Sequence, residues 1–156
     1  MDRWRAMRDD DLPTVNRIAD RVHPNFPESD AIPVERLALY PAGCLALEIN
    51  GDVMGYAVSH PWRAGSPPSL DSLLGRLLDA PDTYYVHDLA LLPEARGTGA
   101  AAQAVALLIA QAGHEGLPGI TLIAVNNSAG FWQRHGFSVI GPAPASYGPD
   151  AAVMMR

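Results

Sequence analysis

The sequence has one cysteine, few basic residues and no long apolar run, and each shortage excludes a class of protein. Because Cys44 stands alone, an internal disulfide and a zinc site built from cysteines are both excluded. Lys and Arg total 11 against 17 Asp and Glu, giving a formal net charge of -6. This charge argues against a nucleic-acid partner.

No stretch of the sequence is apolar over a length that crosses a bilayer, since Gln103 interrupts the longest one. The first residues also lack the apolar segment of a signal peptide. We therefore expect a cytoplasmic protein with no membrane partner. A chain of 156 residues, 48% of them hydrophobic, fits a single domain over residues 1–156.

A glycine loop between a strand and a helix is the most informative stretch that is present. Residues 84–92 are aromatic and apolar and have the length of a strand, which Pro93 closes. Residues 100–112 are strong helix formers and end at Gly113. The loop therefore lies directly before the first turn of a helix.

The start of this helix predicts a site for a phosphate group. Its first N–H groups have no partner within the helix, and the helix dipole adds about half a positive charge there. Gly97 and Gly99 leave these donors uncovered, while Thr98 offers one capping oxygen. Arg96 adds a charged group beside them.

The remaining segments alternate between strand and helix patterns. Asn50-Gly51 supplies the positive φ angles of a hairpin turn. We expect strands at 4–8, 43–49, 53–59, 84–92, 119–125, 136–140 and 151–155, helices over 9–22, 33–40, 100–112 and 127–135, and an inserted loop with a helix over 60–81. This order predicts an α/β protein with a mixed sheet and helices on its faces.

Two motifs carry a resemblance to a known family. Residues 91–101 are similar to a strand end, a proline and an Arg/Gln-x-x-Gly-x-Gly/Ala signature, with Arg96, Gly99 and Ala101 at the signature positions. Residues 126–137 are similar to a block of Asn, a small residue, an aromatic pair and Gly-Phe. Together they resemble the GNAT superfamily of acyl-CoA-dependent N-acetyltransferases, in which one helix and one strand separate the two motifs.

The resemblance implies the GNAT fold, a mostly antiparallel sheet of six or seven strands that splays between its fourth and fifth strands and carries helices on both faces. The pantetheine arm of acetyl-CoA would lie in the gap, and its pyrophosphate would lie on the helix start. The residues implied for coenzyme A binding are Leu89, Ala90, Leu91, Arg96, Gly97, Thr98, Gly99, Ala100, Ala101, Asn126, Asn127, Phe131 and Trp132. For the two asparagines a helix cap is an equal alternative.

The implied reaction is direct transfer of an acetyl group to a primary amine in a ternary complex. The amine must first lose a proton, because an alkylamine has a pKa of about 10.4. Strand alternation places Tyr85, His87, Leu89 and Leu91 on one face and Asp88 on the other. His87 is the candidate general base, with Tyr85 beside it and a histidine of the core as the alternative.

A proton donor for the departing thiolate is missing from its usual place. Family members frequently have a tyrosine four residues before the Gly-Phe glycine, where this sequence has Trp132, and an indole N–H is too weak an acid. Tyr147, Tyr84 and His135 remain open as substitutes. A thiol pKa of about 8.5 also permits departure without a strong acid.

Two other functions remain open. The tryptophan at position 132 is compatible with a non-catalytic acyl-CoA-binding module. Residues 97–102 satisfy the Gly-x-Gly-x-x-Ala pattern of dinucleotide-binding enzymes, although no acidic residue ends the next strand. The resemblance leaves the acceptor open between small-molecule and peptide amines, implies no metal and is compatible with a homodimer.

Overall fold

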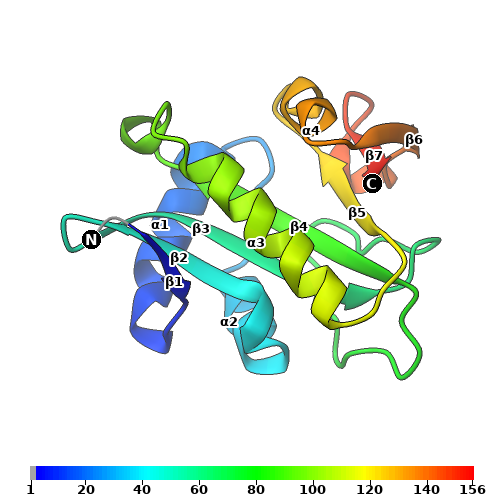
Figure 1. Ribbon diagram of the computed structural model, residues 1–156, viewed down its shortest axis with the longest axis horizontal. Helices are drawn as coiled ribbons and strands as arrows, with labels where there is room; N and C mark the ends of the chain where they lie inside the picture. Colours follow the sequence, from blue (N-terminus) through cyan, green and yellow to red (C-terminus); the bar gives the residue numbers. More distant parts are fainter. Residues whose placement is uncertain (1–2) are drawn as a thin grey trace.

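Seven strands form one sheet in the computed structural model, which describes residues 3–156 (Figure 1). Along the chain they are β1 (Arg3–Ala6), β2 (Cys44–Ile49), β3 (Asp52–Trp62), β4 (Thr83–Leu91), β5 (Ile120–Ala124), β6 (Ser138–Pro142) and β7 (Ala152–Met155). Their spatial order is β1-β2-β3-β4-β5-β7-β6. Only β4 and β5 are parallel among these neighbours. The predicted mixed, mostly antiparallel sheet is confirmed.

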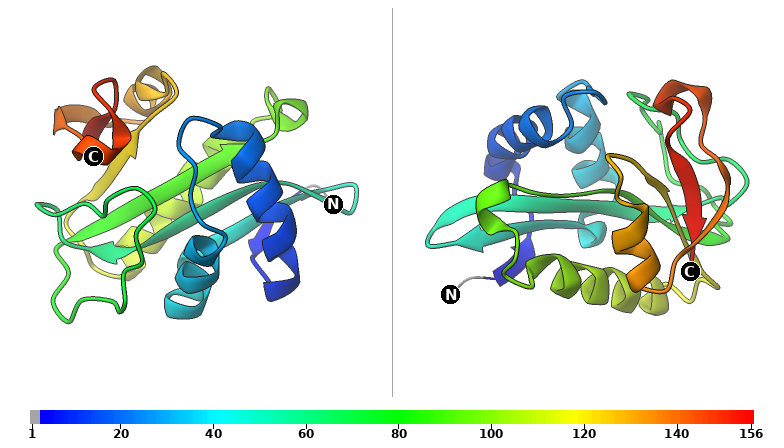
Figure 2. Two further views of the ribbon diagram at one scale, coloured as in Figure 1. Left: turned by 180° about the vertical axis from the view of Figure 1, so that it is seen from behind. Right: turned by 90° about the horizontal axis from the view of Figure 1, so that it is seen from above.

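Helices cover both faces of the sheet, as predicted. Helices α1 (Leu12–Val22) and α2 (Ala31–Leu39) lie on one face, and α3 (Ala100–His114) and α4 (Ala129–Arg134) lie on the other (Figure 2, right). Each face has its own apolar core, one built around α1 and the other around α3. No helix within residues 3–156 is both long and apolar enough to span a membrane.

The hairpin predicted at Asn50-Gly51 joins β2 and β3. The two residues have φ angles of 52° and 84°, and Ile49 pairs with Asp52 across the turn. Positive φ at both central positions is the geometry that favours this dipeptide. The local turn chemistry therefore fixes the register of the two strands.

The helix predicted within 60–81 is wrong. β3 runs on to Trp62, and the described residues 63–82 contain no helix. Asp71 and Gly75 have φ angles of 57° and 79°, which an α-helix does not tolerate. The carboxylate of Glu35 in α2 accepts the N–H groups of Leu74 and Gly75 at 2.7 and 2.9 Å. Tertiary hydrogen bonds thus replace those of a helix, and this segment of 69–75 is held against α2.

A β-bulge at His87 corrects the predicted face assignment of β4. In β3, Val58 pairs with Asp88 and Ser59 with Val86, so His87 has no partner there. One extra residue resets the alternation of side chains. His87 and Asp88 therefore face α1 together, and the prediction of opposite faces is wrong.

The side chains that follow the bulge along β4 show the same shift in alternation. Ala90 packs in the core around α1, whereas Leu89 packs against the residues around α3. Leu91 contacts the first residues of α3, including Ala100. The predicted common face of His87 with Leu89 and Leu91 is therefore also wrong.

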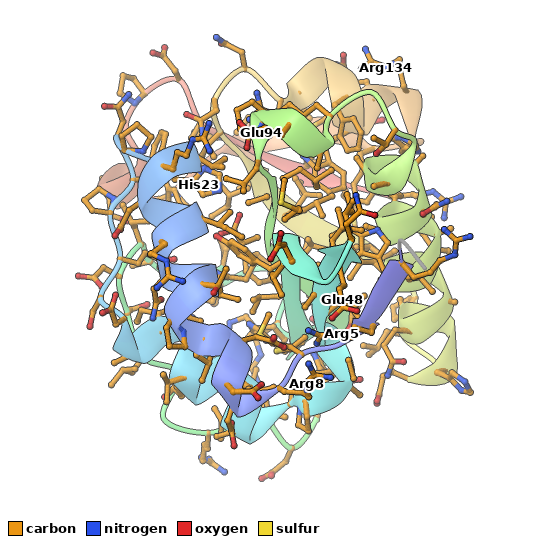
Figure 3. All side chains as sticks on the ribbon, turned by 90° about the vertical axis from the view of Figure 1, so that its left-hand side faces the viewer. Arg5, Arg8, His23, Glu48, Glu94 and Arg134 are labelled. Atoms are coloured by element: carbon orange, nitrogen blue, oxygen red, sulfur yellow. The ribbon has the colours of Figure 1, made fainter. Side chains whose placement is uncertain are left out.

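A largely buried ion pair ties β1 to the turn that precedes α1. The guanidinium of Arg5 donates to both carboxylate oxygens of Asp11 at 2.8 and 2.9 Å, and Arg8 N–H donates to Asp11 at 2.7 Å. Arg5 also reaches Glu48 on β2, as Figure 3 shows. The hydrogen bonds from Arg5 lower the pKa of Asp11 below its ordinary value. The pair thereby joins the first strand, the second strand and the first helix.

We expect Asp11→Asn to lower the free energy of unfolding by about 1–3 kcal/mol, because it leaves a half-buried guanidinium without its counterion. Since the folded pKa of Asp11 is lowered, this stability is present above the ordinary aspartate pKa of about 4 and is lost as the pH falls through the folded value. Urea unfolding at pH 7 and pH 3.5 measures both effects. Asp10→Asn, whose side chain is 81% exposed, is the control and should change little. Equal effects of the two variants would contradict the assignment.

Candidate active site

A cavity of about 580 Å³ lies where β4 and β5 diverge. It runs between two chemically different ends. One end is formed by the start of α3, and the other by His87, Asp88 and the loop between α1 and α2. The cavity is therefore long enough to hold two groups that meet near the middle of β4.

The gap exposes one edge of β4. On β4, β5 pairs with Tyr84–Val86, so beyond the bulge no strand of residues 3–156 lies on that side of β4. Leu92 N–H donates to Met54 O on β3 at 2.9 Å. Because backbone groups alternate along a strand, those of Ala90 face β3 and those of Leu89 and Leu91 face the gap. This edge offers N–H and C=O groups to an extended ligand.

The start of α3 is open, as the sequence predicts. Gly97 and Gly99 have φ angles of 78° and 82°, and no side chain of the described residues caps the helix at Gly99. The hydroxyl of Thr98 donates to Ala95 O at 2.7 Å, so it is largely used within the loop and lies 3.4 Å from Ala100 N. Arg96 is exposed and lines the cavity. This end is therefore positive and rich in free donors.

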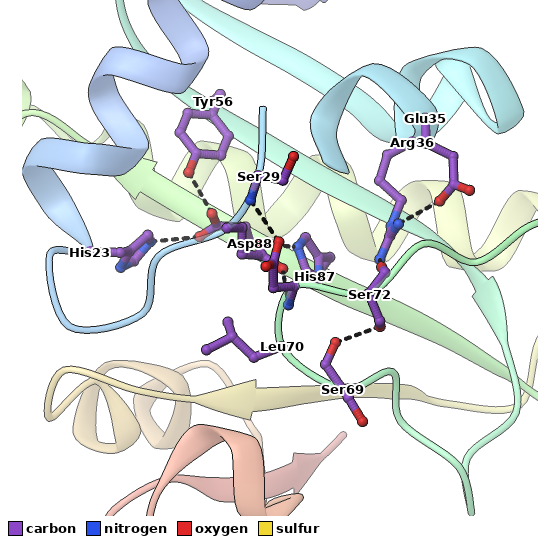
Figure 4. A network of polar contacts seen from close by, with 12 residues as sticks. His23, Ser29, Glu35, Arg36, Tyr56, Ser69, Leu70, Ser72, His87 and Asp88 are labelled. Atoms are coloured by element: carbon purple, nitrogen blue, oxygen red, sulfur yellow. Dashed lines mark hydrogen bonds and ion pairs between the residues drawn. The ribbon is translucent and has the colours of Figure 1, made fainter. Parts of the chain in front are cut away.

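His87 carries a free nitrogen at the opposite end of the cavity. Its Nε2 lies 2.8 Å from Glu28 Oε1, and its Nδ1 is buried without a hydrogen-bond partner (Figure 4). Burial, the largest single influence, opposes ionisation of Glu28, but the hydrogen bond and charge of His87 and the N–H of Asp71 together outweigh it and lower the pKa of Glu28. An ionised carboxylate only accepts hydrogen bonds, so Nε2 carries the proton and the lone pair of a neutral His87 is on Nδ1.

A second pair, His23 and Asp88, lies beside the first (Figure 4). Asp88 accepts hydrogen bonds from His23 Nε2 at 2.8 Å and from Tyr56 Oη at 2.5 Å. The side-chain amide of Asn126, at the end of β5, lies 2.8 Å from His23 Nδ1. His23 therefore bridges the two diverging strands.

The pKa values of this pair shift in opposite directions. Burial, the largest single influence, lowers the pKa of His23, but the charge and hydrogen bond of Asp88 and the charge of Glu28 together outweigh it and raise the pKa above the ordinary value. Burial raises the pKa of Asp88, and the attraction of His23 lowers it below the ordinary value. Each group thus stabilises the charged form of the other.

Among the substitutes for the missing tyrosine, only Tyr147 lines the cavity. Tyr84 is fully buried and hydrogen bonds to Ser59 at 2.6 Å, and His135 stacks on Phe131 with ring centroids 4.7 Å apart. Trp132 lines the cavity as a buried ring. Of the three candidates, Tyr147 is therefore the one that contributes to the cavity wall.

Most of the residues predicted from the sequence meet in this one cavity. Those lining it are His87, Leu89, Ala90, Leu91, Arg96, Gly97, Gly99, Ala100, Ala101, Asn126, Phe131, Trp132 and Tyr147. Thr98, Asn127 and Tyr85 do not line it. Tyr85 is buried and interacts with Tyr147, which lines the cavity. It therefore supports Tyr147 without contributing to the cavity surface itself.

Sequence reasoning missed His23, Phe26, Glu28 and Leu70, and it turned Asp88 away from the site. His23 to Glu28 read as an ordinary loop, since no local pattern places it over β4. Within the segment 60–81, Leu70 lines the cavity, whereas Trp62 and Arg63 are absent from the cavity wall formed by the described residues. The long-range hydrogen bonds of Glu28 and His23 are the signal, and only the structure shows them.

Comparison with known families decides the family. The sequence model of the acetyltransferase (GNAT) family matches residues 4–137. The chain belongs to this family. A comparison with curated protein sequences gives no significant match.

Solved structures confirm the GNAT fold. Ard1 from Thermoplasma volcanium superposes with a TM-score of 0.78 at 15% identity, over 98% of this chain and 95% of its own. Arabidopsis thaliana Naa50, in complex with the bisubstrate analogue CoA-Ac-MVNAL, gives 0.75 at 15% identity over 98% and 96%. The GNAT-like decarboxylase GphF, in complex with isobutyryl-CoA, gives 0.82 at 16% identity over 99% and 98%. At these identities the neighbours establish the fold, and the site must supply the chemistry.

Membership of the GNAT family makes the protein an acyltransferase with acetyl-CoA as its cosubstrate. The dinucleotide alternative is therefore set aside. The cavity between β4 and β5 is the one place among the described residues where the two family motifs meet.

We expect the imidazole of His23 to titrate above the ordinary value of about 6.5, and Asp88→Asn to lower its pKa. Because the folded pKa is raised, the pair stabilises the protein below about pH 6.5, and this stability is lost as the pH rises through the folded value. NMR titration of the histidine side chains measures both proteins. A pKa of His23 below 6.5 in the wild type would refute the ion pair. A pKa of His23 that is the same in the wild type and in Asp88→Asn would also refute it.

Proposed function

We propose that this GNAT protein is an N-acetyltransferase that moves the acetyl group of acetyl-CoA to a primary amine by direct attack in a ternary complex. The observation that carries the proposal is a single cavity that joins an open helix start, a free strand edge and a buried imidazole with an unpaired nitrogen. Each of these three features suits one part of the reaction. Residues 1–156 would serve as one domain.

Coenzyme A would lie along the gap with its pyrophosphate on the start of α3. The N–H groups that follow Arg96 and the guanidinium itself supply positive charge there. The pantetheine arm would add to the edge of β4 through the backbone of Leu89 and Leu91. An N–H of this edge would also polarise the thioester carbonyl as the oxyanion forms. Asn126, Phe131 and Trp132 would line the other side.

His87 would act as the general base. In the tautomer that Glu28 selects, the buried Nδ1 holds the lone pair of an imidazole that lines the cavity. It would take a proton from the attacking ammonium, directly or through one water, while Glu28 stabilises the imidazolium that results. The neutral amine then attacks the thioester carbonyl, and the C–S bond breaks to release the thiolate. The nitrogen gives up its second proton to the thiolate or to solvent as the neutral amide forms.

Tyr147 is the candidate to assist the departure of that thiolate. Burial raises its pKa above the ordinary value, so the phenol keeps its proton at neutral pH and would stabilise the thiolate by donating a hydrogen bond, since it is a weaker acid than a thiol with a pKa of about 8.5. A non-catalytic acyl-CoA-binding module remains the alternative. Release of free thiol from acetyl-CoA across a panel of amines tests the function, and coenzyme binding without turnover would favour the module.

We expect His87→Ala to lower kcat by about 10²–10⁴-fold, the usual contribution of a general base, while the affinity for coenzyme A changes little. His114→Ala removes an exposed imidazole at the end of α3 and is the control. Thiol release measures the rate, and calorimetric titration with coenzyme A measures the affinity. An unchanged rate would remove His87 as the base.

We expect Gly99→Ala to weaken coenzyme A binding about tenfold or more, equivalent to at least ~1.4 kcal/mol. The methyl group would stand before the free N–H donors, and an L-residue with φ near +82° is strained. Gly116→Ala is the matched control, because its φ of +68° carries the same strain beyond the other end of α3. Calorimetric titration compares the two variants, and equal affinities would mean that the helix start does not hold the diphosphate.

A further inference from the structure

The acceptor end of the cavity has an unusual balance of charge. Glu28 and Asp88 contribute two carboxylates, whose side chains are 18% and 16% exposed. Both carboxyl groups have pKa values below their ordinary range, so they are ionised at neutral pH. An acceptor therefore meets two carboxylates, one paired with His23 and the other with His87, the imidazole that would activate it.

No permanent positive charge offsets these carboxylates. The sequence contains no lysine, so all 11 basic residues are arginines. Among the described residues that line the cavity, the only arginine is Arg96, at the α3 end that takes the diphosphate. Arg36 is the nearest buried arginine to the insertion, and its guanidinium is held by Glu35 at 2.7 Å and Ser72 O at 3.2 Å, outside the cavity wall.

The positions of the carboxylates are fixed by bonds that a substrate does not supply. Glu28 Oε2 accepts the N–H of Asp71 at 2.9 Å, and the Asp71 carboxylate accepts the N–H of Ser29 at 2.6 Å. Figure 4 shows Ser29, His87 and Asp88 close together, with Leu70 below them in the view. Glu28 therefore cannot turn away from the cavity without breaking the contact between two loops.

The rest of the acceptor end is apolar. Phe26 and Tyr147 lie with ring centroids 6.4 Å apart, and Leu70 lines the same wall. The buried, unpaired Nδ1 of His87 is the one polar atom here that lacks a partner among the described side chains lining the cavity. It is the position that an incoming amine would satisfy.

On the basis of the acetyltransferase function, we propose that the acceptor is an α-amino amide with an apolar side chain, and that the site rejects free α-amino acids. A carboxylate next to the amine would lie against Glu28 and Asp88 with no arginine to receive it. The neutral carbonyl of an amide avoids this repulsion. The amide of a small molecule and the first peptide bond of a chain share this chemistry.

Matched acceptors test the proposal. We expect kcat/KM for methioninamide to exceed that for methionine by about 100-fold, as charge repulsion at one site can give. The dipeptide Met-Ala, whose carboxylate is one residue further away, should lie close to the amide, and a much poorer rate for it would restrict the acceptor to small amides. Equal use of methionine and methioninamide would overturn the proposal.

The variant Glu28→Gln isolates the charge. It should lower the ratio of kcat/KM for methioninamide to kcat/KM for methionine by at least about tenfold. The rate with methioninamide itself should also fall, because His87 loses its charged partner. Glu115→Gln removes one charge at the far end of α3 and should leave the ratio unchanged. An unchanged ratio in Glu28→Gln would show that Glu28 does not set the selectivity.

Binding to the complex with coenzyme A separates this proposal from the acetyltransferase function. Calorimetric titration of methioninamide and methionine into protein saturated with coenzyme A needs no turnover. Selective binding of the amide with no thiol release would leave the acceptor class standing and remove the enzymatic function. Turnover of both acceptors at equal rates would support the enzymatic function and overturn the proposed acceptor class.

Discussion

The site depends on one extra residue in β4. At the bulge, His87 has no partner in β3, so the side chains of His87 and Asp88 both turn toward α1. The same shift turns the backbone of Leu89 toward the gap instead of toward β3. Without the bulge, the imidazole of His87 would still face the cavity, but the side chain of Asp88 would point to the opposite face of the sheet. The backbone groups of Leu89 would then face β3 instead of the gap. A one-residue irregularity thus assembles the acceptor end and the coenzyme edge together.

The second constraint is the free-energy cost of burying the carboxylates of Glu28 and Asp88 at a place where no arginine pairs with them. Two carboxylates in a largely enclosed cavity would be expensive alone, and each has its own imidazole at 2.8 Å. An imidazole, unlike a guanidinium, can give up its proton near neutral pH. The pairing therefore keeps the site stable while leaving one nitrogen of His87 free for chemistry, which a permanent cation could not do.

The parts of the structure set by local rules could be predicted from the sequence. Apolar periodicity placed the strands, Asn50-Gly51 placed the hairpin, and the glycines at 97 and 99 placed the open helix start. The bulge could not be predicted, because alternation carries no sign of an inserted residue. Glu28 was missed for a related reason, since its role comes from contacts to residues 43 and 59 positions away. Long-range hydrogen bonds also replaced the helix expected in the insertion.

The tryptophan at position 132 bears on which step of the proposed reaction needs help from a side chain. Its ring packs edge-on against Phe131 and Phe137 in the core, so it contributes shape and no proton. A thiol with a pKa of about 8.5 is a better leaving group than an amine with a pKa of about 10.4, so collapse of the intermediate favours loss of sulfur even without an acid. Deprotonation of the ammonium has no such advantage, because the cation must lose its proton before it can attack. In the proposed mechanism, His87 and the carboxylate of Glu28 that orients it would act on that step.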